Sequence, residues 1–173
     1  MTATPRPNPL ATSEFWRRAG PVLLVLAVLG LYLGTRFRLA IDGQVHHCLP
    51  PYTVWLIDRH DRRLVRGAPV AFVAGNRMEP FFGLDQSVIK RLAGIPGDHV
   101  AVTAEHTTSN GIQVGTGLAL AATLGRPASD FIRTETVPAD AVWMMGDTPD
   151  SYDARYWGAL PLAQIRGRAY ALF

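Results

Sequence analysis

A run of sixteen uncharged residues, AGPVLLVLAVLGLYLG at positions 19–34, constrains this chain more than any other feature. Arginines flank it on both sides: Arg17, Arg18, Arg36 and Arg38. A helix over the run would span about 24 Å of the roughly 30 Å hydrocarbon core, and its neighbours extend it. No polar face interrupts the run, so a buried helix of a globular core fits poorly. We therefore predict a transmembrane anchor over residues 19–37.

A cleaved secretory signal peptide is the alternative, because a charged start and a short apolar stretch are both present. Tyr32 and Leu33 occupy the place where a small-x-small cleavage site would stand, which favours a retained anchor. Three arginines precede the run and two follow it, and basic flanks favour the cytoplasmic side. We expect residues 1–18 to form a cytoplasmic tail. Residues 39–173 would lie on the outer, periplasmic face of the inner membrane.

The charge distribution argues against a nucleic-acid partner. Although the formal net charge is +3, residues 39–173 hold 12 basic and 13 acidic side chains, so the excess belongs to the ends of the anchor. A nucleic-acid-binding domain needs a clustered positive face. A single cysteine can form neither an internal disulfide nor a multi-cysteine metal cage. We expect no metal and no other cofactor.

Short β-branched or aromatic runs with Gly and Pro turns dominate the remaining residues. Strands are predicted at 54–58, 69–75, 141–147 and 167–173, and residues 87–102 predict a strand, a Pro-Gly-Asp turn and a second strand. The polar segment 60–67 predicts a hairpin or a wide loop, and residues 117–125 predict the one short helix of this part. This pattern indicates a mainly β, mostly antiparallel domain.

Lys90 is the only lysine among 17 basic residues. Its neighbours Val88, Ile89, Leu92 and Ala93 are apolar. Lysine, unlike arginine, can lose its proton in apolar surroundings, so Lys90 is a candidate general base. A coding bias toward arginine that spared one lysine is the alternative.

Cys48 is the only cysteine and lies in HHCLPPY. The two prolines that follow restrict the backbone, which suits a held loop and a candidate nucleophile. A small buried hydrophobic residue is the alternative. His46 or His47 could serve as its base, and only one of two adjacent side chains would face it. A metal site built from these three residues is disfavoured, because consecutive ligands do not readily converge.

Residues 146–158, GDTPDSYDARYWG, place three aspartates close to a serine and an arginine. Asp153 and Arg155 could form a charge-assisted pair that holds a turn beside a site. A solvated loop is one alternative. A calcium loop is another, although the glutamate and spacing of an EF-hand are missing.

Together these features resemble the type I signal peptidases of the S26 class, and within it most closely the TraF-type peptidases of bacterial conjugation. The anchor is followed by Cys48-Leu49-Pro50, by IKRLAGIPGD at 89–98, by the segment 146–158 and by IRGRAYALF at 165–173. Residues 103–140 form a weakly matched, variable insertion. The resemblance implies coiled antiparallel β-sheets over residues 39–173, behind one N-terminal transmembrane helix.

The resemblance further implies a membrane-anchored endopeptidase that processes an exported precursor, a signal peptide or pilin-type substrate of a conjugative or type IV secretion system. Cys48 falls where the family has its catalytic serine, and Lys90 falls on the general base. Ser151 matches a serine that orients the lysine, and Asp153 and Arg155 match a stabilising pair. The sequence departs from the family in its cysteine. His46 stands where many relatives offer an oxyanion hydroxyl.

The expected partners are an exported precursor protein, the lipid bilayer and other conjugation or secretion components. Whether water or another amine resolves the acyl intermediate stays open, so hydrolysis and peptide cyclisation or ligation both remain. A non-catalytic pilus-assembly or scaffold protein that kept the peptidase fold is the alternative, because the nucleophile is substituted. A self-cleaving repressor fits less well, because the chain has a membrane anchor and lacks a DNA-binding module.

Overall fold

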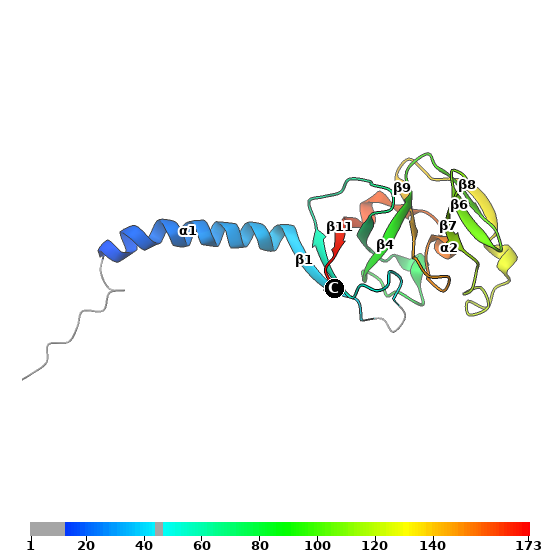
Figure 1. Cartoon of the computed structure of the whole chain (residues 1–173), viewed down its shortest axis with the longest axis horizontal. Helices are drawn as coiled ribbons and strands as arrows, with labels where there is room; N and C mark the ends of the chain where they lie inside the picture. The colour runs from blue at the N-terminus through cyan, green and yellow to red at the C-terminus, as the bar shows by residue number, and fades with distance from the viewer. Residues whose placement is uncertain (1–12, 44–46) are drawn as a thin grey trace, which may run out of the picture. The chain divides into compact units, whose positions relative to one another are not determined.

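The computed structural model describes residues 13–43 and 47–173, and the chain divides after Phe37 into two units. The first is the helix α1, Ser13–Arg36, which contains the whole apolar run and buries none of its residues (Figure 1). By length and composition α1 could cross a membrane, a test that an N-terminal signal sequence also passes. Phe37, the last residue of the predicted anchor, is the first residue of β1. Residues 1–12 of the predicted tail lie outside the described residues.

The second unit, residues 38–173, consists mainly of two antiparallel β-sheets, as predicted. The seven-stranded sheet has the order β1-β2-β11-β3-β4-β9-β10, and the four-stranded sheet has the order β7-β6-β5-β8 (Figure 1). The strands are β1 Phe37–Ile41, β2 Val54–Asp58, β3 Pro69–Val73, β4 Ser87–Gly94, β5 His99–Val102, β6 His106–Ser109, β7 Ile112–Thr116, β8 Arg133–Thr136, β9 Ala141–Met145, β10 Leu160–Pro161 and β11 Ile165–Ala171. One short helix, α2 Ala154–Trp157, and three 3₁₀ turns, η2 Asn76–Met78, η3 Ala128–Asp130 and η4 Leu162–Gln164, complete the described unit.

The predicted strands correspond to β2, β3, β4, β5, β9 and β11. The segment 60–67 forms a wide loop, because β11 lies between β2 and β3 in the sheet. The turn at 96–98 carries the chain from β4 in the larger sheet to β5 in the smaller one. The smaller sheet is completed by β6, β7 and β8, which lie in the segment 103–140 and were not predicted.

The helix predicted over residues 117–125 is wrong. The segment forms consecutive turns, in which the N–H of Ala121 donates to the Leu118 carbonyl at 3.1 Å and the N–H of Gly125 to the Ala122 carbonyl at 3.0 Å. Gly117 and Gly125 have φ values of 63° and 66°, outside the helical range. The few residues between these glycines cannot offset the cost of helix nucleation.

The larger sheet carries apolar clusters on both faces, and the two clusters position the site. Val70 and Phe72 of β3 join the main cluster, whereas Ala71 between them joins a second one with Trp55. Alternate side chains of a strand point to opposite faces, so the second cluster covers the other side of the sheet. Leu49 belongs to it and is only 3% exposed. The loop before β2 is therefore anchored to the sheet by the residue that follows Cys48.

Asp98 ties the turn between the two sheets to its surroundings. Its carboxylate accepts hydrogen bonds from the guanidinium of Arg66, from the backbone N–H of Ile95 at 2.8 Å and from Asn110 Nδ2 at 2.9 Å. The hydrogen bonds from Arg66 hold the pKa of Asp98 well below its usual value of 3.8, although burial opposes this. The charged form of Asp98 therefore stabilises the junction between the sheets.

We expect Asp98→Asn to lower the free energy of unfolding by about 2 kcal/mol near neutral pH, because charge-assisted hydrogen bonds are lost. Since folding lowers the pKa of Asp98, the stabilisation is complete above the unfolded value near 3.8 and fades as the pH falls below it. Urea unfolding of both proteins should therefore give a smaller difference at about pH 3 than at about pH 7. An equal difference at both pH values would contradict this account.

Candidate active site

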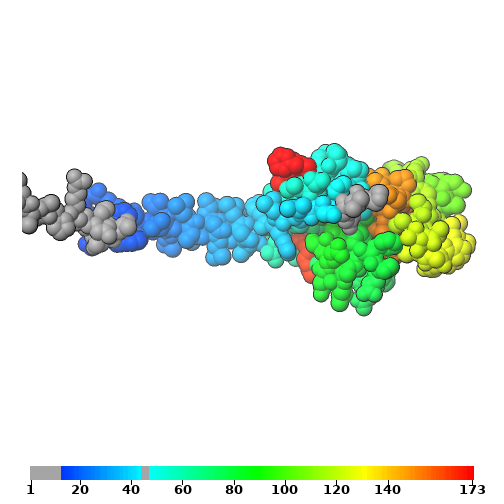
Figure 2. Space-filling model, turned by 90° about the horizontal axis from the view of Figure 1, so that it is seen from below, coloured from blue at the N-terminus to red at the C-terminus, as the bar shows by residue number. Residues whose placement is uncertain are grey.

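Cys48 and Lys90 come from distant parts of the sequence and meet beside the larger sheet. Cys48 lies in the loop between β1 and β2, and Lys90 lies within β4, opposite Val70 of β3. The Nζ atom of Lys90 donates a hydrogen bond to Cys48 Sγ at 2.9 Å and another to Ser151 Oγ at 2.7 Å. The structure thus brings together three of the residues selected from the sequence. In Figure 2 the cyan segments that follow β1 lie against the green segments around β4.

Lys90 and Cys48 differ in their exposure to solvent. Lys90 is fully buried, with 0% of its surface exposed, and its Nζ lies 5.6 Å from the centre of the Phe82 ring. Cys48 is partly exposed and lines a cavity of about 300 Å³, whose walls come from β1, the loop itself, β2 and β4. A reactant in this cavity can therefore reach the sulfur, while the amine contacts it from the protein side.

The loop that carries Cys48 is attached to the turn after β9. The backbone N–H of Asp147 donates to the Cys48 carbonyl oxygen at 2.8 Å. The carboxylate of Asp147 accepts a hydrogen bond from Arg91 Nε at 2.7 Å. Because Arg91 follows Lys90 on β4, both members of the Cys48–Lys90 pair are connected to the same turn.

Gly146, at the start of that turn, was not selected from the sequence as a site residue. A Cβ atom at this position would overlap the side chain of Ser151 and would lie 3.1 Å from the carbonyl oxygen of Cys48. The N–H of Gly146 donates to Asp153 Oδ2 at 3.0 Å. Gly146 therefore allows Ser151 to approach the Cys48 loop, a role that depends on three-dimensional contacts and has no distinct sequence signal.

We expect Gly146→Ala to slow alkylation of Cys48 by iodoacetamide about tenfold, since displacing Ser151 removes one of the contacts that hold the Lys90 amine. Gly83→Ala is the matched control, because a Cβ there would meet only the side-chain oxygen of Gln86, at 4.0 Å. The alkylation rate of the single cysteine is followed by intact mass. Equal rates in Gly146→Ala and the control would show that Ser151 does not position the amine.

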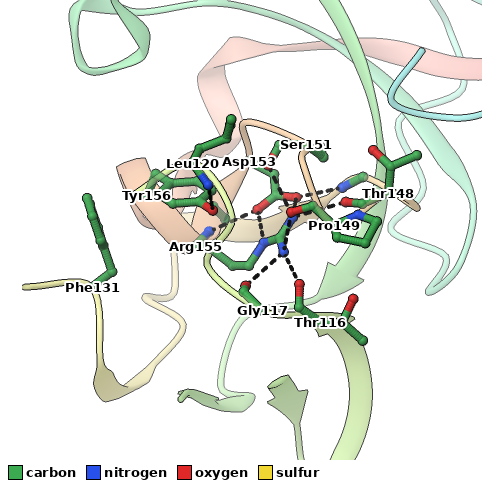
Figure 3. Close-up of polar contacts among 12 residues, drawn as sticks. Thr116, Gly117, Leu120, Phe131, Thr148, Pro149, Ser151, Asp153, Arg155 and Tyr156 are labelled. Atoms are coloured by element: carbon green, nitrogen blue, oxygen red, sulfur yellow. Dashed lines mark hydrogen bonds and ion pairs between the residues drawn. The ribbon is translucent and has the colours of Figure 1, made fainter. Parts of the chain in front are cut away.

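Asp153 and Arg155 form a fully buried ion pair below the turn (Figure 3). Arg155 Nε lies 2.8 Å from Asp153 Oδ1, and Arg155 Nη2 lies 2.8 Å from Oδ2. Burial works against the charge of Arg155, but hydrogen bonding and attraction to Asp153 outweigh it and raise the pKa of Arg155. The predicted pair therefore exists and holds the turn that carries Ser151.

The Arg155 guanidinium also connects this turn to the smaller sheet. It donates to five backbone carbonyl oxygens, those of Thr116, Gly117, Thr148, Pro149 and Ser151 (Figure 3). The carboxylates of Asp147 and Asp153 are both engaged with arginines. This arrangement favours a structural ion-pair network over the calcium-loop alternative.

The two histidines before Cys48 differ in what the structure describes. His46, the proposed oxyanion or auxiliary residue, lies outside the described residues. His47 Nδ1 lies 3.3 Å from Asp42 Oδ2. In the described residues, the Lys90 amine therefore contacts Cys48 Sγ, whereas His47 lies beside the Asp42 carboxylate.

The described residues thus form a β-rich unit in which the thiol of Cys48 contacts the amine of a buried lysine, Lys90. A sequence model of the family described as signal peptidase, peptidase S26, matches residues 16–173. The chain therefore belongs to the S26 signal peptidase family.

Two curated relatives support this assignment. The chain is 34% identical to signal peptidase I of Leptolyngbya laminosa over 91 residues, which cover 52% of this chain and 42% of the relative. It is 35% identical to probable signal peptidase I-2 of a Synechocystis strain over 86 residues, covering 49% and 37% respectively. The matches thus span about two fifths of the length of these relatives.

A solved structure gives a further similarity. The crystal structure of a signal peptidase I from Enterococcus faecalis V583 is 25% identical, and the match covers 65% of this chain and 99% of the other, with a TM-score of 0.39.

Proposed function

We propose that this protein is a membrane-anchored endopeptidase that cleaves exported precursors, with Cys48 as nucleophile and Lys90 as general base. The contact of 2.9 Å between Lys90 Nζ and Cys48 Sγ carries this proposal. Membership of a peptidase family supports it. A thiol needs less activation than a hydroxyl, so cysteine suits the position that serine occupies in the family.

In the proposed reaction, Cys48 Sγ attacks the carbonyl carbon of the scissile peptide bond. The thiol proton passes to Lys90 Nζ and then to the nitrogen of the leaving amine, which leaves a thioester on Cys48. Ser151 holds Nζ in place through its hydroxyl oxygen. The backbone N–H of Cys48 serves as oxyanion donor, with His46 as a second donor. Water, activated by Lys90, then hydrolyses the thioester.

The proposed location follows from the apolar helix and its flanking charges. Helix α1 anchors the protein in the inner membrane, and residues 39–173 lie on the periplasmic face, where exported precursors emerge. The order of the sequence motifs favours a TraF-type peptidase, whose substrate is a pilin-type or signal-peptide-bearing protein of a conjugative or type IV secretion system. The bilayer and other components of that system are the remaining proposed partners.

The test uses the full-length protein in detergent, incubated with candidate precursors from its own transfer system. Intact mass of the products should show cleavage by the wild type, no cleavage by Cys48→Ala and residual cleavage by Cys48→Ser. A product whose mass is lower than that of the hydrolysed fragment by one water would indicate cyclisation instead of hydrolysis. Undiminished cleavage by Cys48→Ala would overturn the proposed nucleophile.

The substitution of serine by cysteine is the observation that favours a non-catalytic scaffold protein as the second candidate. The two candidates differ in the expected behaviour of the thiol. A scaffold has no need of a reactive sulfur, so Cys48 would be alkylated no faster than an ordinary cysteine in a peptide. An enzyme would show faster alkylation that depends on Lys90.

A further inference from the structure

The contact between Cys48 and Lys90 joins the only thiol of the chain to its only side-chain amine. Lys90 Nζ donates directly to Cys48 Sγ at 2.9 Å, so a short movement would bring nitrogen and sulfur to bonding distance. Ser151 Oγ, 2.7 Å from Nζ, is a second hydrogen-bond partner that restrains the amine. Lys90 Nζ and Cys48 Sγ are therefore close enough to react with each other once the sulfur is oxidised.

The surroundings of the pair favour one outcome when the sulfur is oxidised. Cys48 is partly exposed and lines the cavity of about 300 Å³, so a small peroxide can reach it. A sulfenic acid condenses with a thiol to a disulfide or with a backbone nitrogen to a sulfenamide, and a neutral amine is a better nucleophile than a backbone amide nitrogen. The sequence contains no second cysteine. The buried Lys90 amine is therefore the nucleophile in direct contact with the oxidised sulfur.

We propose that Cys48 and Lys90 form a modification site at which a peroxide closes a reversible sulfenamide bond. The peroxide first transfers an oxygen atom to the Cys48 thiol, which gives the sulfenic acid and releases an alcohol or water. The neutral Lys90 amine then attacks the sulfur. The sulfur–nitrogen bond forms, the sulfur–oxygen bond breaks, and one water molecule leaves with the hydroxyl group and an amine proton.

The bond is reversed by a thiol reductant. One thiol attacks the sulfur, which frees the Lys90 amine and leaves a mixed disulfide, and a second thiol then restores the Cys48 thiol and leaves as a disulfide. The closed bond also protects the sulfur from irreversible oxidation to sulfinic acid. Formation of the bond rests on the geometry alone. Loss of peptidase activity while it is closed rests in addition on the proposed function.

The experiment treats the reduced full-length protein in detergent with hydrogen peroxide in small molar excess, which can supply more than one oxygen atom for each thiol, and measures its intact mass. The sulfenamide lowers the mass by about 2 Da, and dithiothreitol restores it. Peptide mapping should identify a cross-linked pair that contains residues 48 and 90. After denaturation, acylation should modify one amine fewer than in the reduced protein. A gain of about 32 Da with Lys90 still open to acylation would overturn the proposal.

Lys90→Arg is the matched variant, since arginine is a long side chain with N–H donors but lacks the amine. It should gain oxygen irreversibly under the same treatment and show no cross-link. If this variant does not fold, the peptide map of the wild type alone shows whether residues 48 and 90 are cross-linked. A parallel cleavage assay separates the two claims. If the protein cleaves a precursor but forms no cross-link, the sulfenamide is overturned and the proposed function stands. If it forms the cross-link but cleaves no precursor, the sulfenamide stands and the proposed function is overturned.

Discussion

Lys90→Met is expected to lower the rate of precursor cleavage by about a thousandfold, because it removes the group that accepts the thiol proton and returns it to the leaving amine. Methionine has a similar length and no charge, so it can fill the buried space around Lys90 without introducing a polar group, and the one buried partner it deprives of a donor is Ser151 Oγ. The Lys90→Met protein should therefore fold but should cleave the precursor much more slowly. The measurement is the initial cleavage rate of a precursor by full-length protein in detergent.

Arg62→Met serves as the control, because Arg62 lies exposed in the loop between β2 and β3. It should cleave at the wild-type rate. Thermal unfolding of both variants checks that any loss of activity does not come from unfolding. A Lys90→Met protein that is folded and cleaves within a factor of about ten of the wild type would exclude Lys90 as the general base.

Arg155→Met is expected to lower the free energy of unfolding by about 3–5 kcal/mol, the largest effect on stability that we predict. The substitution would leave the Asp153 carboxylate charged and buried without its cation. It would also remove the guanidinium donor from five backbone carbonyl oxygens, of which that of Thr148 still accepts from the Ser151 N–H. The turn that holds Ser151 would lose its support. Urea unfolding of the full-length protein in detergent measures this loss.

A double variant separates the ion pair from the other contacts of Arg155. Asp153→Asn together with Arg155→Met removes both charges, so it should be less destabilised than the sum of the two single variants. The difference measures the cost of a buried unpaired charge. An Arg155→Met protein that loses less than about 1 kcal/mol, the range of exposed ion pairs, would show that the network is not a determinant of stability.

The residues of the candidate site could be selected from the sequence because their types are unusual. Cys48 and Lys90 are each the only residue of their kind, and Ser151 lies in a dense polar segment. Their proximity could not be worked out from residue patterns alone. It depends on the place of β4 in the sheet and on the packing of Leu49, which are long-range properties of the fold.

The strands that were predicted contain consecutive apolar residues, as in AVWMM of β9. The sequences HTTS of β6 and RTET of β8 lack such runs, and their pairing in the smaller sheet comes from tertiary contacts. Residues 117–125 are rich in alanine and leucine, which favour a helix, but the backbone at the glycines on either side overrides this preference. The role of Gly146 could not be predicted from the sequence either, because it depends on the Ser151 side chain that lies against it.

We propose that the sulfur of Cys48 and the amine of Lys90 act as one chemical unit, and the alkylation rate of Cys48 tests this without any substrate. The chain has one cysteine, so uptake of iodoacetamide reports on this sulfur alone. Measured across pH, the wild type should react faster near neutral pH than an ordinary peptide thiol, and Lys90→Met should lose that advantage. Identical rate–pH profiles for the wild type and Lys90→Met would contradict the account.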